Sequence, residues 1–206
     1  MNSDHPLEIL VEELSAEFAL RSILPKIVPG EVFEIRVFRG KPDLLKKLPA
    51  RLAGYAAWPG AVNAKLVVIV DRDDDDCEQL RQQLDATATR ASFVPRGPTR
   101  GILNRIAVEE LEAWFFGDFG AVSAAYPRVP VTAAAKSAFR VPDAIQGGTA
   151  EAFERLLQQH GYHKGGLAKV DAARAVSVHM DVENNQSRSF QVFRDGLREL
   201  LRIGRA

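Results

Sequence analysis

Apolar residues recur along the first half of the chain in two alternating patterns. Short continuous or alternating runs predict β-strands at residues 7–11, 33–38, 65–70 and 101–108. Stripes with apolar residues three and four positions apart predict helices at residues 15–27, 42–52 and 78–89. Strands that alternate with helices are typical of α/β proteins with a mostly parallel sheet. We therefore expect a three-layer, Rossmann-like fold with about four strands.

The predicted strands differ in how much polar character they carry. Residues 65–70 include a continuous run of Leu, Val and Ile, which is typical of a central strand covered on both faces. Residues 33–38 alternate between apolar and polar, which indicates a strand exposed on one face, at the edge of the sheet.

The pattern changes after Gly117 and Asp118. Short helical segments follow, separated by Pro127, Pro130, Pro142 and two pairs of glycines, with no convincing strand among them. We expect residues 1–118 to form the α/β domain and residues 119–206 to form a C-terminal helical extension packed on it.

Composition narrows the class of protein. The chain has 206 residues, 46% of them hydrophobic, with 27 basic and 27 acidic side chains, so a nucleic-acid surface would have to be a local patch. Cys77 is the only cysteine, which excludes an internal disulfide and a cysteine-based zinc cluster. We find neither a secretory signal nor a transmembrane run, and we expect a cytoplasmic protein that does not contact a membrane.

Five aspartates within six residues follow the most apolar strand. Asp71 and Asp73 lie at the strand end, where alternate residues project to the same side and can converge on one ion. Carboxylate oxygens are the ligands that hard cations prefer, so the pair predicts a site for Mg²⁺ or Mn²⁺. The next three, Asp74–Asp76, fit the capping positions of the following helix.

The first strand also ends in acids, Glu12 and Glu13, with Glu17 one helical turn further on. If the first and third strands are neighbours, these acids lie close to Asp71 and Asp73. Glu17 equally fits a first-turn position after a Ser15 cap. Among the acids after the fourth strand, Glu109, Glu110 and Glu112, we favour Glu112 as a ligand of a second ion, although an exposed helix start explains it as well.

Basic residues in the second half are suited to phosphate oxygens. Lys169, Arg188 and Ser189 are the candidates, although Ser189 also fits the cap of a final helix with a phenylalanine core face. Two further groups could contact a nucleic-acid backbone but equally fit a solvated surface. These groups are Arg36, Arg39 and Lys41, and Arg96, Arg100 and Arg105.

The order of these motifs resembles the Toprim domain of topoisomerases, bacterial primases, recombination proteins and the overcoming-lysogenization-defect nucleases. Val11-Glu12-Glu13 stands where Val-Glu-Gly is usual, and Val70-Asp71-Arg72-Asp73 stands at the Asp-x-Asp motif. The resemblance implies catalytic roles for Glu12, Asp71 and Asp73. Because Glu13 replaces the glycine, either Glu12 or Glu13 would point into the site.

The whole chain is similar to an uncharacterised bacterial family of small Toprim-like proteins, some associated with ATPases in phage-defence loci. The stretches that carry this similarity are residues 10–13, 70–73, 110–114 and 185–190. It implies a magnesium-dependent nuclease whose partners are nucleic acid, a separate ATPase subunit and a second copy of the chain. Two alternatives stay open: a binding module without turnover, and a dehalogenase-like phosphatase with Asp71 as its nucleophile.

Overall fold

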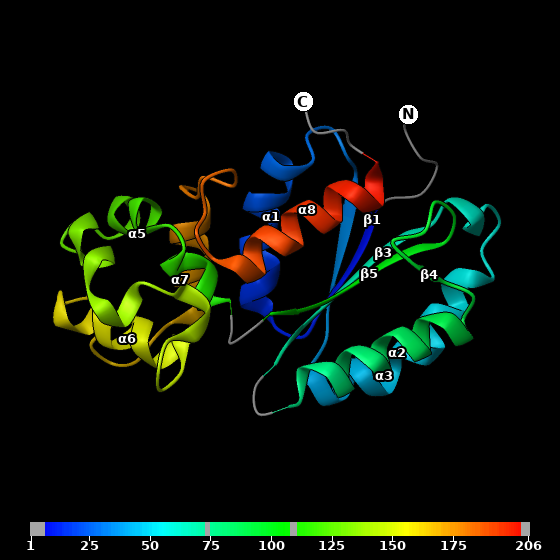
Figure 1. Ribbon diagram of the computed structural model, residues 1–206, viewed down its shortest axis with the longest axis horizontal. Helices are drawn as coiled ribbons and strands as arrows, with labels where there is room; N and C mark the ends of the chain where they lie inside the picture. Colours follow the sequence, from blue (N-terminus) through cyan, green and yellow to red (C-terminus); the bar gives the residue numbers. More distant parts are fainter. Residues whose placement is uncertain (1–6, 73–74, 108–110, 203–206) are drawn as a thin grey trace.

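The computed structural model describes residues 7–72, 75–107 and 111–202, in which a twisted parallel sheet runs through the centre of an α/β fold (Figure 1). The strands are β1 (Leu7–Val11), β2 (Phe33–Val37), β3 (Lys65–Asp71), β4 (Val94–Pro95) and β5 (Gly101–Ala107). Every pairing is parallel, and the order across the sheet is β2-β1-β3-β5-β4. The predicted α/β class is confirmed, with the two-residue β4 as the strand that the sequence pattern did not show.

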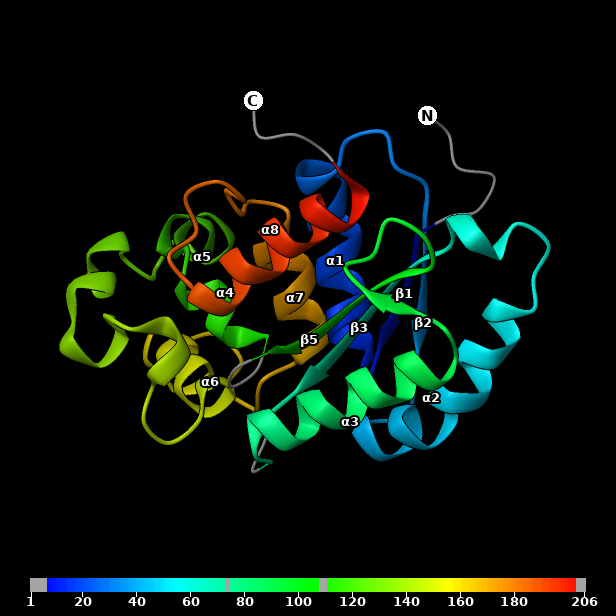
Figure 2. The ribbon, with the colours of Figure 1, turned by 45° about the vertical axis from the view of Figure 1, so that its right-hand side comes forward.

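Helices cover both faces of the sheet and build a separate group beside it (Figure 2). The α-helices are α1 (Leu14–Ile27), α2 (Lys41–Ala56), α3 (Cys77–Arg90), α4 (Glu112–Phe116), α5 (Phe119–Ala125), α6 (Thr149–Gln159), α7 (Lys169–Ser177) and α8 (Arg188–Leu201). Single 3-10 turns are η1 (Ala61–Asn63), η2 (Val131–Ala135), η3 (Ser137–Phe139) and η4 (Pro142–Ala144). Within the described residues no helix has both the length and the apolar character that a membrane crossing requires.

Alternation along the strands divides the buried apolar residues between two cores. Ile9 and Val67 face α1 and α8, whereas Leu10 and Val68 face α2 and α3. Residues 66–70 of β3 are all buried, which confirms the expected central strand. In β2 only Ile35 is buried, which agrees with its place at the edge.

The C-terminal helix α8 belongs to the layer that α1 begins. A Cβ atom on Gly196 would lie 3.1 Å from Leu103 Cδ1, and one on Gly101 would lie 2.7 Å from Leu200 Cδ1. The later part of α8 therefore lies over the start of β5, and the two elements run antiparallel. This direction places the first turn of α8 at the carboxyl end of β5.

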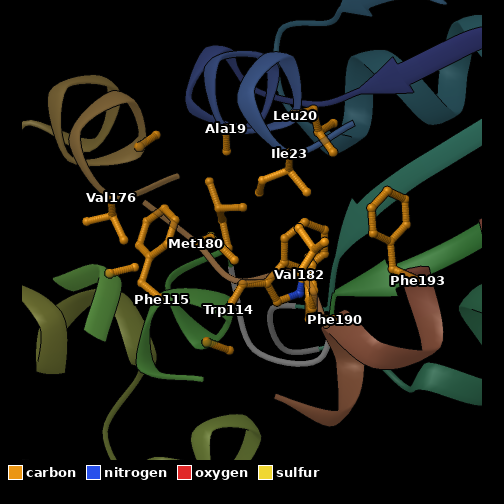
Figure 3. Packing of buried hydrophobic residues seen from close by; sticks show 14 of the residues in the cluster. Ala19, Leu20, Ile23, Trp114, Phe115, Val176, Met180, Val182, Phe190 and Phe193 are labelled. Atoms are coloured by element: carbon orange, nitrogen blue, oxygen red, sulfur yellow. The ribbon is translucent and has the colours of Figure 1, made fainter. Parts of the chain in front are cut away.

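Aromatic residues join α8 to the short helix α4, which follows β5 (Figure 3). The Trp114 ring stacks on Phe193 with centroids 5.1 Å apart and meets Phe190 edge to face at 5.2 Å. Such pairs stabilise a core beyond the effect of their buried area. They hold α4 against α8.

Helix α7 connects the helical group to α1. Lys26 Nζ, near the end of α1, donates hydrogen bonds to three carbonyl oxygens at the end of α7, those of Ser177, Val178 and Met180. Arg174 lies over the ring of Phe18, closer to the start of α1. The two helices therefore run in the same direction, with their first turns on the side of the sheet where β1 ends.

Candidate functional site

The sheet has a switch point between β1 and β3. The chain passes from β1 to β2 on one side and then returns to β3 on the other side of β1. In open parallel sheets the connections diverge at such a point and leave a crevice at the carboxyl ends of the two strands. Glu12 directly follows β1, and Asp71 is the last residue of β3, so both acids lie at this crevice.

Glu12 and Asp71 are in direct contact. The Glu12 carboxylate accepts a hydrogen bond from the backbone amide of Asp71. Glu12 is only 9% exposed, whereas Asp71 is half-buried. A buried carboxylate is held in place by hydrogen bonds because its charge is costly to remove from water. The structure therefore brings together the two acids that the sequence placed on different strands.

A small cavity of about 10 Å³ lies against these two acids, which is roughly the room that one water-sized species needs. Its walls are otherwise largely apolar. The residues that line it are Glu12, Glu13, Ala16, Leu20, Ile69, Asp71, Leu111 and Trp114. Charges interact more strongly in such poorly solvated surroundings than in water.

Lys41 holds the segment that follows β3. Its side chain is buried at 8% exposure, and Nζ donates to the carbonyl oxygens of Asp71 at 2.9 Å and Arg72 at 3.0 Å. Nζ also pairs with the Asp75 carboxylate at 2.7 Å. Lys41 begins α2 just after β2, so three neighbouring strands contribute a side chain to the crevice. The expectation that Lys41 fits a solvated surface is wrong, because the side chain turns inward onto these oxygens.

The aspartates within residues 71–76 have different roles. Asp76 caps α3, because its Oδ1 accepts hydrogen bonds from the amides of Glu78 and Gln79, both at 2.9 Å. Asp75 is the partner of Lys41 rather than a helix cap. Asp73 and Asp74 lie outside the described residues, so the proposed ligand role of Asp73 stays a prediction.

The other acids after β1 have partners within their own helix. Helix α1 begins at Leu14 with Glu13 as its N-cap, and the buried Ser15 hydroxyl donates to the Glu13 carboxylate. The expected Ser15 cap is therefore wrong by two positions. Glu17 pairs with Arg21 at 2.6 Å, one turn further along the helix. Glu13 lines the cavity and Glu17 does not, and their roles as ligands stay predictions.

Glu112 is the first residue of α4 and is 1% exposed. The expectation of an exposed helix start is therefore wrong for this residue. Glu112 is not among the residues that line the cavity at Glu12 and Asp71. Glu109 and Glu110 lie outside the described residues. A second ion site at Glu112 remains a prediction.

Three or more metal-binding side chains do not come together anywhere in residues 7–72, 75–107 and 111–202. Glu12 and Asp71 supply two carboxylates at one cavity, and the type of ligand suits Mg²⁺ or Mn²⁺. A third protein ligand would come from Asp73, the next residue of the Asp-x-Asp pattern.

The start of α8 already holds an anionic group. Asp143 accepts hydrogen bonds from the Ser187 hydroxyl at 2.8 Å and from the amides of Arg188 at 2.6 Å and Ser189 at 3.2 Å. Ser187 is the N-cap of α8, so the expected cap at Ser189 is wrong. The Ser189 hydroxyl instead accepts a hydrogen bond from Trp114 Nε1 at 3.0 Å.

The predicted phosphate-binding residues lie on two different helices. The exposed Arg188 begins α8, and the half-buried Lys169 begins α7. Because α7 runs alongside α1 in the same direction, Lys169 lies toward the start of α1. Phosphate binding by Lys169, Arg188 and Ser189 stays a prediction, and a phosphate at the Ser189 amide would compete with Asp143.

Two contributors to the site were not singled out from the sequence as parts of it. Lys41 comes shortly after the end of β2 and directly after a glycine. This position indicates a site residue only when β2 is known to lie beside β1. Trp114 lines the cavity and also binds Ser189, so it connects the acids to α8. An aromatic residue in an apolar run carries no comparable signal.

The fold and the site define a three-layer, Rossmann-like α/β protein with acidic side chains and a buried lysine at the carboxyl edge of its parallel sheet. The chain belongs to the family described as Domain of unknown function (DUF4276), whose model matches residues 11–198. No curated protein and no solved structure matches the chain.

Proposed function

We propose that the protein is a Mg²⁺- or Mn²⁺-dependent phosphodiesterase that acts on nucleic acid through a Toprim-like site. The observation that carries the proposal is the contact between Glu12 and Asp71 at the switch point of the sheet. Two acids from neighbouring strands at one cavity are the arrangement that the resemblance to Toprim domains implies. An ATPase partner, which the similarity of the whole chain to the uncharacterised Toprim-like family implies, would control access of the substrate.

The cavity suits a hard cation in size and in the chemistry of its ligands. Glu12, Asp71 and Asp73 would hold the ion, and Glu13 also lines the cavity. When bound, such an ion polarises a phosphodiester and neutralises charge on the leaving oxygen. The Asp71 amide orients the Glu12 carboxylate toward the end of β3.

Lys41 serves this site as a positioning residue. Its ammonium group fixes the backbone of Asp71 and Arg72 and ties Asp75 to the start of α2. The segment that carries Asp71 is thereby anchored to the start of α2, which follows the strand on the far side of β1. Preorganisation of this kind keeps acidic side chains together despite their mutual repulsion.

Cleavage assays with single variants test the proposal. We expect wild-type protein to cleave labelled DNA or RNA in Mn²⁺ or Mg²⁺ and to be inactive in EDTA. Glu12→Gln and Asp71→Asn should each reduce the rate by about two orders of magnitude or more, because each removes a charged ligand. Asp85→Asn, on α3 away from the crevice, is the matched control and should cleave like wild type. Equal cleavage by all three variants would refute the assignment of the site.

A binding module without turnover is the second candidate. No group of three or more side chains that could hold a metal ion occurs within the described ranges, which favours it. Ion binding at Glu12 and Asp71 without cleavage of single- or double-stranded substrates, also after addition of an ATPase encoded beside it, would select this candidate.

A further inference from the structure

A groove of about 380 Å³ runs along the outer side of α8. We call it the arginine groove, lined by Arg96, Arg188, Val192, Asp195, Gly196, Arg198 and Glu199. Its residues come from α8 and from the turn between β4 and β5, two segments that lie far apart in the sequence. Only Val192 offers an apolar side chain of any size, so the groove does not resemble a site for an apolar ligand.

The arginine groove continues toward an open edge of the sheet. β4 pairs with β5 only at Gly101 and Ile102, so no described strand covers β5 beyond these residues. Arg105 lies on this uncovered part of β5. Its Nε is buried and makes no hydrogen bond within the described residues. Burial, together with the charges of Arg96 and Arg81, lowers the pKa of Arg105, which indicates three cations near one another.

The acids in this region are already paired with basic side chains. Glu199 contacts Arg96 at 3.2 Å, and Asp195 contacts Arg194 at 2.9 Å. In contrast, the guanidinium groups of Arg188 and Arg81 form no ion pair in the part of the chain that the structure describes, although the Arg188 amide donates to Asp143. Because both are exposed, their guanidinium groups are available to an anion from outside the chain.

The arginine groove ends beside the acidic site. Arg188 begins α8, whose first turn lies at the carboxyl end of β5, and β5 neighbours β3 at Asp71 and Ala107. The next residue, Ser189, accepts the hydrogen bond of Trp114, whose ring lines the cavity at Glu12 and Asp71. One side of the start of α8 therefore faces the arginine groove, and the other contacts a wall of the acidic cavity.

We propose that the arginine groove, with Arg81 and Arg105 beyond it, binds the sugar-phosphate backbone of a nucleic acid and leads it to the acidic site. The claim that the bound nucleic acid leads to the acidic site rests on the proposed function. The claim that the groove binds nucleic acid does not. Arg96 and Arg198 in the groove already pair with Glu199 and Glu183. The guanidinium groups that suit the repeated phosphates of a nucleic acid are therefore those of Arg188 in the groove and of Arg81 beyond it. An acidic protein segment is the competing partner, and the test separates the two.

Binding without divalent metal tests the groove separately from catalysis. We would measure the anisotropy of a short labelled DNA, single-stranded and duplex, in EDTA over a series of salt concentrations. Arg81→Glu and Arg188→Glu should each weaken binding by about tenfold and make the slope of log K against log salt shallower by about one. Lys46→Glu, at an exposed residue of α2 that does not line the groove, is the matched control and should bind like wild type.

Each outcome decides one question. If both arginine variants bind DNA as tightly as wild type, the proposed role of the arginine groove is wrong. It is also wrong if the wild-type protein binds neither the single-stranded nor the duplex DNA. Displacement by polyglutamate at the same charge concentration as DNA would also overturn it, in favour of an acidic protein partner. Loss of binding in the arginine variants, with unchanged thermal unfolding, supports it. If wild type cleaves nucleic acid and the arginine variants bind and cleave it equally well, the proposed function is supported but the proposed role of the groove is wrong.

Discussion

The carboxylate of Glu12 accepts a hydrogen bond from the backbone amide of Asp71, and this contact joins the ends of β1 and β3. Because the bond comes from the backbone, it fixes where Glu12 points without using the Asp71 side chain. Structure and chemistry therefore make different demands on Glu12. Its hydrogen-bond acceptor holds the amide of Asp71, whereas its negative charge is what the proposed cation would require.

Two substitutions at Glu12 separate these demands. Glu12→Gln keeps an oxygen acceptor, so we expect little change in the free energy of unfolding but at least about tenfold weaker Mn²⁺ binding. Glu12→Ala leaves the Asp71 amide without its acceptor and should lower the free energy of unfolding by about 1–3 kcal/mol. Urea unfolding and calorimetric Mn²⁺ titration measure the two effects. Equal Mn²⁺ affinity in Glu12→Gln and wild type would exclude Glu12 as a ligand.

Lys41 should be important for stability in a way that an exposed lysine on the same helix is not. Lys41→Met removes the donor to the carbonyls of Asp71 and Arg72 and should cost about 1–3 kcal/mol. Lys47 makes an exposed pair with Asp43 one turn away, so Lys47→Met should change stability by less than about 0.5 kcal/mol. Chemical denaturation of both variants tests the difference. Similar losses in the two would show that Lys41 does not hold the segment after β3.

Tyr162 should ionise at lower pH than the other two tyrosines, Tyr55 and Tyr126. Burial, with the hydrogen bond to Glu8, raises the pKa of Tyr55 to about 12, and burial raises that of Tyr126 to about 12. The Arg128 guanidinium lowers the pKa of Tyr162. Tyrosinate absorbance should therefore rise first from Tyr162, and Tyr162→Phe should abolish that first step. An unchanged first step in Tyr162→Phe would contradict this order.

The raised pKa of Tyr55 also predicts how stability depends on pH. The folded value lies above the ordinary value of about 10, so neutral Tyr55 stabilises the fold below about pH 10. That contribution is lost as the pH rises toward 12. Tyr55→Phe has no group to ionise there, so its free energy of unfolding should fall less steeply between about pH 10 and 12. If the free energy of unfolding of Tyr55→Phe falls as steeply as that of wild type, groups other than Tyr55 cause the loss of stability at alkaline pH.

Gly117 and Gly54 should respond to alanine with opposite signs. A Cβ atom on Gly117 would lie 2.1 Å from Asn185 Oδ1 and 2.6 Å from the Ser187 amide, so Gly117→Ala must displace the segment that leads into α8. We expect a loss of about 1–3 kcal/mol. Gly54 lies in α2 with nothing near its Cβ position, and Gly54→Ala should gain about 0.5–1 kcal/mol. Thermal melts of the two variants check both signs.

The sequence predicted the central strands well because their apolar pattern is long and regular. Residues 7–11 match β1 in full, and residues 65–70 match β3 but for its last residue, Asp71. β4 was missed because its two residues, Val94 and Pro95, are both exposed and carry no periodic pattern. Helix α2 extends to Ala56, beyond the predicted end at 52, because Tyr55 continues its buried stripe.

The site was only partly predictable because no local sequence pattern specifies the order of the strands in the sheet. Glu12 and Asp71 stood out as acids at strand ends, and their contact depended on β1 and β3 being neighbours. The role of Lys41 depended on β2 lying on the other side of β1. The capping of α8 by Asp143 joins residues more than forty positions apart, which no local spacing rule predicts.

A crystal soaked in Mn²⁺ provides the most direct test of the central claim, that Glu12 and Asp71 form a divalent-metal site at the switch point of the sheet. We predict an anomalous difference peak within coordinating distance of both carboxylates, at about 2.0–2.3 Å, and no peak there in Glu12→Gln crystals soaked in the same way. A map of wild-type crystals that shows Mn²⁺ only elsewhere, or no Mn²⁺ at all, would contradict the claim.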